Sequence, residues 1–408
     1  MSSEILIVGG GIGGLTLALT LHEAGLPCRV FEAAPEIKAL GVGINLLPHA
    51  TAVLGRLGLE PALASVAITT KESVYFTRFG QFIYSEPAGR AAGHASPQFS
   101  IHRADLHRVL FDAVVARIGS DRVHLGWKCA GVDQDDDHAI LRFVNATTGD
   151  PLDPQRGAAA IGCDGIHSTI RRQLHPSEGE PIYSGVNMWR GTTVWPPMLS
   201  GASMIRAGWL TPAKIVVYPI RDNVDGRGRQ LVNWVVEIET PEHTTRDWNR
   251  RGRLDDFIGP LADWHFDWLD VPAFIRAADQ ILEFPMVDQD PLPFWTRGRV
   301  TLLGDAAHPM YPRGSNGAGQ AILDAHALSG ALRRGSDPRA ALAEYERERL
   351  PPTAAVVRMN RSNPPDAILR EVQVRSGDRP FASIDQVMSR SEMEALLSTY
   401  RQVTGNVR

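Results

Sequence analysis

The 408-residue chain is poor in cysteine, with only Cys28, Cys129 and Cys163. No two of them form a CxxC pair, so the sequence indicates neither a disulfide framework nor a zinc site. It also lacks any run of the roughly 18 apolar residues that a membrane-spanning helix needs. The apolar N-terminal run has no basic leader and is interrupted by glycines, which argues against a signal peptide. These absences predict a cytoplasmic protein without a metal site.

A strong charge of either sign is absent too. The chain has 42 Lys+Arg against 46 Asp+Glu, a formal charge of -4. Such a balance offers no general attraction to nucleic acid or to an anionic membrane, so a small-molecule partner is expected. The length favours two domains of roughly 100 to 200 residues each.

The N-terminal segment combines the features of a dinucleotide-binding turn. A β-branched strand at 4–8 leads through five glycines in six positions into a helical pattern at 15–24, and a second strand ends at Glu32. In Gly9-x-Gly11-x-x-Gly14 the glycines allow, in order, a tight turn, close approach of a pyrophosphate and close packing of helix on strand. Glu32 is placed to accept a hydrogen bond from a ribose hydroxyl.

Two further motifs each follow a strand-like run. The first reads GCDGIHSTIR from Gly162 to Arg171, and the second reads GDAAHP from Gly304 to Pro309. Neither motif is specific when it stands alone. No second GxGxxG follows on a later βαβ unit, so a separate nicotinamide domain is not expected.

The middle of the chain has a different texture. Between Met188 and Glu239 strand-like runs alternate with turns, which predicts an antiparallel sheet. Residues 74–84 read as a hairpin, 103–118 as a helix, and 133–137 as a solvated hairpin turn. Helices within 253–278 are expected to cover one face of the sheet, and the chain beyond about Pro364 is expected to form peripheral helix.

Taken together, the three motifs resemble those of the FAD-dependent aromatic hydroxylases, the group A flavoprotein monooxygenases similar to p-hydroxybenzoate hydroxylase. The resemblance covers about residues 4–350 and implies an α/β fold with a Rossmann-type FAD-binding domain and an inserted antiparallel-sheet substrate domain. The expected FAD-binding domain comprises residues 1–175 and 285–362, and the substrate domain 176–284. Residues 70–100 are candidates to extend the substrate sheet, and 363–408 form a C-terminal helical segment.

The resemblance also implies the contacts of the cofactor. Glycines 9, 11 and 14 would hold the FAD pyrophosphate and Glu32 the adenosine ribose, while Arg103 would help to bind FAD. Asp164 would serve both FAD and NAD(P)H, and Asp305 would bind the ribityl chain. The expected cofactor-binding residues are therefore Gly9, Gly11, Gly14, Glu32, Arg103, Asp164, Asp305, Gly317 and Ala318.

The segment PRGSNGAG, beginning at Pro312, is expected to lie along the flavin ring. Pro312 would sit beside the isoalloxazine, and the backbone at Gly317 and Ala318 would face its N1 and O2 edge. A helix from Gln320 to Leu332 would point its positive end at the negative charge of reduced flavin. Many family members have asparagine where Gly319 stands, so this loop is closer to that of the phenazine-type hydroxylases.

The implied activity is hydroxylation of an aromatic or N-heteroaromatic small molecule through a flavin C4a-hydroperoxide, with NADH or NADPH as transient reductant. The candidate catalytic residues are Pro312, Arg190 and Tyr218. Trp189, Trp209, Pro285 and Met286 are further candidates to line the substrate site, although packing is the favoured role of the two tryptophans. His308 is expected to be structural.

Three alternatives remain open at this point. An epoxidase or a dehydrogenating flavoprotein would share all three motifs, an NAD-dependent dehydrogenase would use the N-terminal fingerprint alone, and a non-catalytic protein would bind FAD without consuming NAD(P)H. The sequence does not choose between a monomer and a homodimer.

Overall fold

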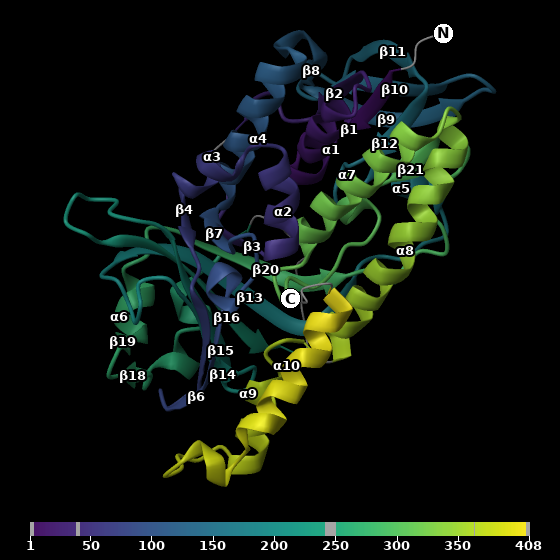
Figure 1. Cartoon of the computed structure of the whole chain (residues 1–408). Coiled ribbons are helices and arrows are strands. Elements are labelled where there is room, and N and C mark those ends of the chain that lie inside the picture. The colour runs from purple at the N-terminus through teal and green to yellow at the C-terminus, as the bar shows by residue number, and fades with distance from the viewer. Residues whose placement is uncertain (1–3, 38–40, 241–249, 363, 405–408) are drawn as a thin grey trace.

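The computed structural model describes residues 4–37, 41–240, 250–362 and 364–404 (Figure 1). Two sheets organise these residues, one of five strands and one of eight. Helix α8 (Pro338–Ser362) runs from the part that contains the smaller sheet towards the C-terminal helices (Figure 1).

The five-stranded sheet is parallel throughout. Its strand order is β21 (Val300–Leu302), β12 (Ala159–Gly162), β1 (Ile5–Val8), β2 (Cys28–Glu32) and β8 (Val123–Leu125). The three central strands are short and almost wholly apolar, as expected of a parallel sheet buried on both faces. Helices α1 (Ile12–Glu23) and α7 (Gly317–Arg334) bury their apolar residues in the same core. The predicted βαβ unit is confirmed.

The eight-stranded sheet is built mainly from the middle of the chain. Its order is β17 (Arg250–Arg251), β20 (Ile281–Asp288), β13 (Ile182–Trp195), β16 (Gln230–Glu239), β15 (Ala213–Arg221), β14 (Ser203–Trp209), β5 (Glu72–Phe76) and β6 (Phe82–Pro87). The sequence predicts an antiparallel sheet, and every pairing is antiparallel except that of β14 with β5. The hairpin of β5 and β6 enters the sheet from the first half of the chain, so β5 and β14 are joined by the long connection that parallel neighbours require.

Smaller elements connect the two sheets. Helix α4 (Arg103–Ile118) has the predicted bounds. The remaining strands and helices of this region are β3 (Gly43–Leu46), β4 (Ala67–Thr69), β7 (Phe99–His102), β11 (Pro151–Gly157), α2 (Pro48–Arg56), α3 (Glu60–Ala64) and α5 (Thr169–Leu174).

The segment 253–278 covers one face of the large sheet, but it is not the set of helices that the sequence predicts. It contains one α-helix, α6 (Val271–Arg276), together with two 3-10 turns and the hairpin of β18 (His265–Phe266) and β19 (Leu269–Asp270). Gly259 and Pro260 lie within this segment and disfavour longer helices. The face is covered by aromatic packing, in which Phe257 stacks on Trp189.

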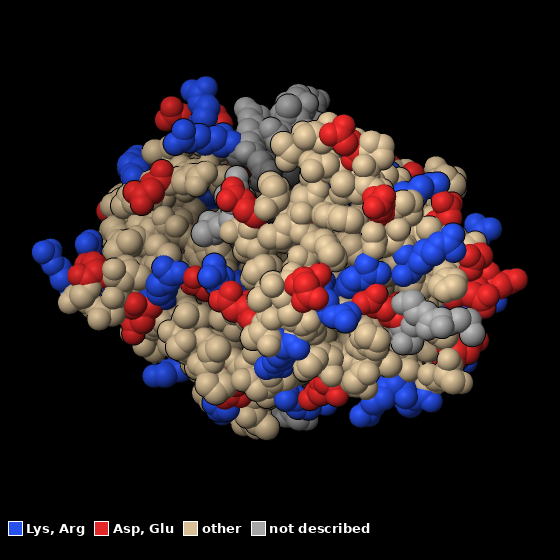
Figure 2. All heavy atoms as spheres, turned by 90° about the horizontal axis from the view of Figure 1, so that it is seen from above, with Lys and Arg blue, Asp and Glu red and all other residues tan. Residues whose placement is uncertain are grey.

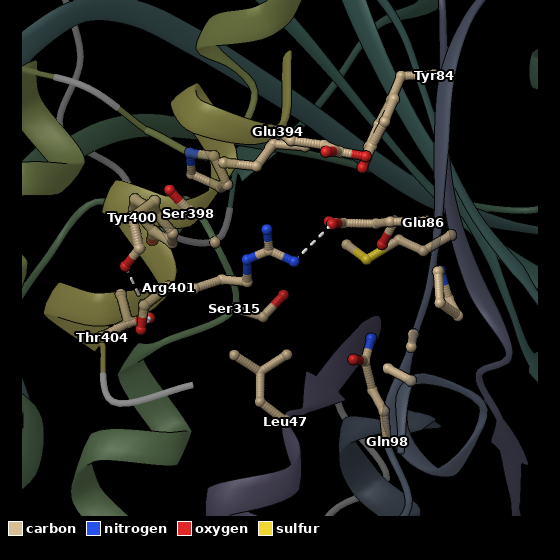
Figure 3. Close-up of a pocket in the computed structure, with 18 of the residues that line it drawn as sticks. Leu47, Tyr84, Glu86, Gln98, Ser315, Glu394, Ser398, Tyr400, Arg401 and Thr404 are labelled. Carbon is tan, nitrogen blue, oxygen red and sulfur yellow. Dashed lines mark hydrogen bonds and ion pairs between the residues drawn. The ribbon is translucent and has the colours of Figure 1, made fainter. Parts of the chain in front are cut away.

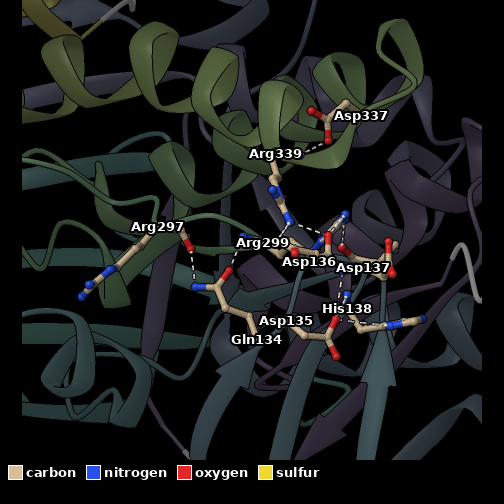
Figure 4. Close-up of polar contacts among 10 residues, drawn as sticks. Gln134, Asp135, Asp136, Asp137, His138, Arg297, Arg299, Asp337 and Arg339 are labelled. Carbon is tan, nitrogen blue, oxygen red and sulfur yellow. Dashed lines mark hydrogen bonds and ion pairs between the residues drawn. The ribbon is translucent and has the colours of Figure 1, made fainter.

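The acidic turn joins β9 (Trp127–Gln134) to β10 (Ala139–Asn145), as predicted. The turn is exposed, but it is also bound to distant parts of the chain. The carbonyl of Asp136 accepts hydrogen bonds from Arg299 and Arg339 (Figure 4). Gln134 Nε2 also donates to the carbonyl of Arg297 at 2.9 Å. The turn thus holds the chain where it enters β21.

The C-terminal helices are not peripheral, contrary to the sequence-based expectation. Helices α9 (Ala367–Ser376) and α10 (Arg390–Thr404) bury an apolar face against β5 and β6 of the large sheet. The cluster contains Tyr75, Ile83, Tyr84, Ile368, Leu369, Val372, Met388, Met393 and Leu397. An ion pair between Lys214 on β15 and Asp366, which precedes α9, is buried beside it.

Charged side chains of both signs are interspersed on the face in Figure 2. This distribution agrees with the nearly balanced composition. Of the helices in the described ranges, none has the length and apolar character needed to cross a membrane.

The packing of α10 predicts a stability cost for a substitution in it. Leu397→Ala is expected to lower the free energy of unfolding by about 2–5 kcal/mol, since it removes a buried side chain from this cluster. Exposed Thr399→Ala on the same helix should stay within about 0.5 kcal/mol of the wild type. Urea denaturation followed by circular dichroism measures the free energy of unfolding of both variants. Equal free energies for Leu397→Ala and Thr399→Ala would show that α10 does not contribute to the core.

Candidate active site

The glycine-rich turn between β1 and α1 has the geometry that its sequence predicts. Gly9 has a φ of +107°, and a Cβ there would collide with the carbonyl of Cys163. A Cβ on Gly14 would collide with the carbonyl of Gly9, so this position must also be glycine. A Cβ on Gly11, by contrast, would meet nothing within 4 Å. Gly11 therefore faces open space at the N-terminus of α1, where a pyrophosphate could approach.

A cavity of about 400 Å³ lies beside this turn. Its lining includes Gly11, Glu32, Arg103 and His107. The Glu32 carboxylate accepts hydrogen bonds from the amides of Gly10 at 2.6 Å and Ala34 at 2.7 Å, which fix its position at the end of β2. The cavity and its carboxylate fit the adenosine end of a dinucleotide.

His107 is a residue of this cavity that the sequence analysis did not identify. Its Nε2 lies 2.6 Å from the carbonyl oxygen of Gly10, so the side chain holds the glycine turn from α4. A signal was present, because His107 stands four residues after Arg103 and therefore on the same face of a helix.

The second motif meets the first through the contact of Gly9 with Cys163. Asp164 accepts hydrogen bonds from Ser168 Oγ at 2.5 Å and from the amide of Thr169 at 2.8 Å. Burial raises the pKa of Asp164 above its ordinary value, and these hydrogen bonds oppose the rise. The Asp164 side chain thus forms its hydrogen bonds with residues at the start of α5.

The third motif ends β21 and leads towards α7. Asp305 is exposed and lies near the backbone of Gly317, the first residue of α7. Behind it, Asp324 is fully buried and bound to His308 Nε2 at 2.5 Å and to Arg349 Nε at 2.8 Å. Burial would raise the pKa of Asp324, but His308 and Arg349 hold it below the ordinary value. His308 is therefore structural, as expected, and Asp305 is left accessible.

The candidate catalytic residues Arg190, Tyr218 and Pro312 line one small inner cavity of about 70 Å³. Arg190 Nη2 donates to the carbonyl of Gly43 at 3.0 Å, which ties β13 to β3. Burial raises the pKa of Tyr218 above its ordinary value, and Arg190 opposes the rise. The structure thus brings together three residues that are far apart in the sequence.

The inner cavity carries an excess of positive charge. Four cationic side chains line it, against the two carboxylates of Glu237 and Asp366. The cations are Arg190, Arg206, Lys214 and Arg313. Lys214 pairs with both carboxylates, which leaves the arginines to dominate the local field.

Arg206 on β14 is one of three cations of this cavity, with Lys214 and Arg313, that the sequence analysis did not identify. Its side chain is 7% exposed, and its Nη1 has no hydrogen-bond partner among the described residues. The guanidinium lies over the ring of Tyr75, 5.2 Å from the centroid, and Nη2 donates to Met204 Sδ at 3.3 Å. The sequence did contain a signal, since an arginine stands within an otherwise apolar strand.

An outer cavity of about 680 Å³ adjoins the inner one (Figure 3). The two share Met204, Arg206, Gly314, Ser315 and Pro365 in their linings. Helix α10 forms one wall, and its Arg401 reaches across to Glu86 on β6 at 2.9 Å. Together the cavities can receive a ligand larger than the inner one could hold.

Several predicted substrate contacts lie elsewhere. Trp189 alternates with Arg190 along β13 and so packs on the opposite face of the sheet, against Phe257. Met286 is fully buried in a cluster behind the cavity, and Trp209 packs beside Lys214 and Arg370. Neither of these two lines the inner or the outer cavity, and the same holds for Pro285.

The glycine geometry predicts different effects at two positions. Gly11→Ala should leave the stability of the FAD-free protein unchanged, because its Cβ meets nothing, while weakening FAD binding by about tenfold or more through the lost approach. Gly14→Ala should destabilise the protein even without FAD. Thermal unfolding and fluorescence titration with FAD separate the two effects, and unaltered FAD affinity in Gly11→Ala would contradict the assignment.

Comparison with known proteins agrees with this geometry. The family model described as "FAD binding domain" matches residues 2–256 and 271–360. The chain is 41% identical over 405 residues to phenazine 1,6-dicarboxylic acid hydroxylase PhzS of Lysobacter antibioticus, covering 98% of this chain and 97% of the relative. It is 34% identical to 3-amino-4-hydroxybenzoate 2-monooxygenase of Streptomyces cremeus, covering 88% and 86% of the two chains.

A solved structure shows the same fold. The structure of Klebsiella pneumoniae HpxO complexed with FAD and uric acid superposes with a TM-score of 0.74 at 22% identity, covering 98% of this chain and 92% of that chain. The glycine turn, the accessible Asp305 and the matched family agree on the cofactor. The chain belongs to the FAD-binding family of aromatic hydroxylases and is an FAD-dependent monooxygenase.

Proposed function

We propose that this monooxygenase hydroxylates an anionic aromatic or N-heteroaromatic acid and uses NADH or NADPH as its reductant. The observation that carries the proposal is the buried guanidinium of Arg206, whose Nη1 has no hydrogen-bond partner among the described residues where the two cavities meet. The printed names of the relatives support it, since phenazine 1,6-dicarboxylic acid and 3-amino-4-hydroxybenzoate are both ring carboxylates.

FAD, when bound and reduced, supplies the oxygen activation that ring hydroxylation needs. The pyrophosphate would lie over Gly9, Gly11 and Gly14, the adenosine ribose at Glu32 and the ribityl chain at Asp305. Arg103 lines the adenosine cavity and would assist there. Asp164 would act through the backbone that it orders at the start of α5. Gly317 and Ala318 would present their amides to the flavin ring, with Pro312 beside it.

Arg206 would bind the substrate carboxylate. A buried N–H group without an acceptor is costly, and a carboxylate that accepts from Nη1 would remove this cost. Tyr75 holds the guanidinium from below, which favours a fixed orientation of the bound group. The acid would then lie with its ring towards the Pro312 loop and its far end in the outer cavity.

Arg190 and Tyr218 would orient the reacting ring. Because burial raises the pKa of Tyr218, its hydroxyl remains protonated near neutral pH and can donate a hydrogen bond to a ring oxygen or nitrogen. Arg190 adds positive charge beside it while bound to the Gly43 carbonyl. The small volume of the inner cavity leaves little room for water around the reacting atoms.

The test compares aromatic acids with their carboxamides as stimulants of NADH or NADPH oxidation by the FAD-loaded enzyme. Acids should stimulate and yield a product one oxygen atom heavier, whereas carboxamides should stimulate weakly. Arg206→Met should raise KM for the acid about 10- to 100-fold, as expected for loss of a hydrogen bond to a charged group. It should change KM for the carboxamide little.

Arg229→Met provides the matched control. Arg229 is exposed on the turn between β15 and β16 and pairs with Asp225 at 2.7 Å, away from both cavities. If Arg206→Met kept the preference for acid over carboxamide, the carboxylate assignment would be wrong. Ligand oxidation without an added oxygen atom would favour the dehydrogenating alternative instead.

A further inference from the structure

We infer that Tyr400 on α10 is a positioning residue for the flavin, because its hydroxyl holds the side-chain amide of Asn316 away from the backbone amides in the first turn of α7. The inference rests on the FAD-dependent activity but goes beyond the substrate proposal. The region containing Tyr400 was expected from the sequence to be peripheral. In the structure the side chain is buried and lies at the edge of the outer cavity beside the loop of residues 312–316 (Figure 3).

Three hydrogen bonds form a directed chain through Tyr400. Asn316 Nδ2 donates to the Tyr400 hydroxyl at 2.6 Å, and that hydroxyl donates to Asn360 Oδ1 at 2.7 Å. Asn360 Nδ2 donates in turn to the carbonyl of Tyr311 at 3.3 Å. The chain begins and ends on the same short loop, so Tyr400 and Asn360 tie residues 311 and 316 together.

This loop has a backbone that needs such support. Gly314 has a φ of +68° and Ser315 a φ of +61°, so two consecutive residues are left-handed. The conformation is rare for serine and persists where the surroundings fix it. A Cβ on Gly314 would collide with the Tyr400 hydroxyl, which shows how closely α10 is seated on the loop.

The position of Asn316 gives the contact a chemical meaning. Asn316 precedes α7 at the N-cap, where asparagine ordinarily accepts a hydrogen bond from a first-turn amide. Here it makes no such bond, and its Oδ1 is buried without a partner among the described residues. Its amide group is turned to Tyr400 instead. The amides that such a cap would bind, those of Ala318 and Gly319, therefore receive no hydrogen bond from the Asn316 side chain.

An uncapped helix N-terminus is suited to an anionic ligand. Asp305 lies beside Gly317, so the open end of α7 belongs to the flavin site. The backbone of Asn316 is αR, not the extended conformation of a capping residue. Without the Tyr400 hydroxyl, Asn316 would be free to change its backbone and side-chain conformation and cap its own helix, and it would then compete with the negative edge of reduced flavin. At its C-terminal end, α10 also meets the first turn of α7, where the Thr404 carbonyl accepts from Gln320 Nε2 at 3.4 Å.

The reduction potential of bound FAD tests this inference independently of substrate turnover. In Tyr400→Phe the potential should become more negative by about 30 mV, which for a two-electron couple corresponds to about a tenfold weaker preference for reduced FAD. Tyr183→Phe is the control, since it removes a tyrosine hydroxyl bound to Thr240 on the large sheet. Its potential should match the wild type.

A second variant separates positioning from general stability. Asn316→Ala in the Tyr400→Phe background removes the competing cap and should return the potential towards the wild-type value. A folded Tyr400→Phe protein with an unchanged potential would overturn the inference, and so would a double variant as shifted as the single one. If Tyr400→Phe does not fold, Asn360→Leu breaks the same chain of hydrogen bonds. The reduction potential of FAD bound to that variant should then be the more negative one. Failure of the substrate proposal would leave this measurement intact, because it needs only bound FAD.

Discussion

The pairing of β21 with β12 is the contact on which the site depends. After leaving the small sheet at β12, the chain builds most of the large sheet and then returns to place Val300, Thr301 and Leu302 beside Ala160, Ile161 and Gly162. Because the strands are parallel, β1, β12 and β21 all end at the same edge, and each carries one of the three motifs there. Without this return, Asp305 and α7 would not lie beside the glycine turn.

Electrostatics divides the site into two regions. At the small sheet, helix N-termini and the Glu32 carboxylate provide a site for a dinucleotide. At the large sheet, the arginines outnumber the carboxylates, and Lys214 forms ion pairs with both Glu237 and Asp366. Burial would raise the pKa of Asp366, but Lys214, Arg313 and Arg206 lower it below the ordinary value. Asp366 therefore stays charged, and the proposed acid substrate would meet the positive charge that the arginines leave in excess.

Local patterns predicted the parts of the structure that local physics determines. The glycine turn, the βαβ unit, α4 and the strands of the large sheet follow from periodicity and glycine geometry. Arg190 and Tyr218 were candidates because they lie on predicted strands, and Pro312 was a candidate through the family resemblance. All three line one cavity, and their catalytic roles stay predictions. The roles of α10 and Arg206 depend on contacts between distant segments, which no local pattern encodes. Packing was the favoured interpretation for the tryptophans, and Trp189 packs on Phe257, which belongs to the segment 253–278 that covers its face of the sheet.

The most direct test of the hydroxylase function is mass spectrometry of the product formed under ¹⁸O₂ from an aromatic acid, with NADH or NADPH as reductant. We expect one labelled oxygen atom to enter the ring for each NAD(P)H consumed. Consumption of NAD(P)H across a panel of aromatic acids without any labelled product would contradict it.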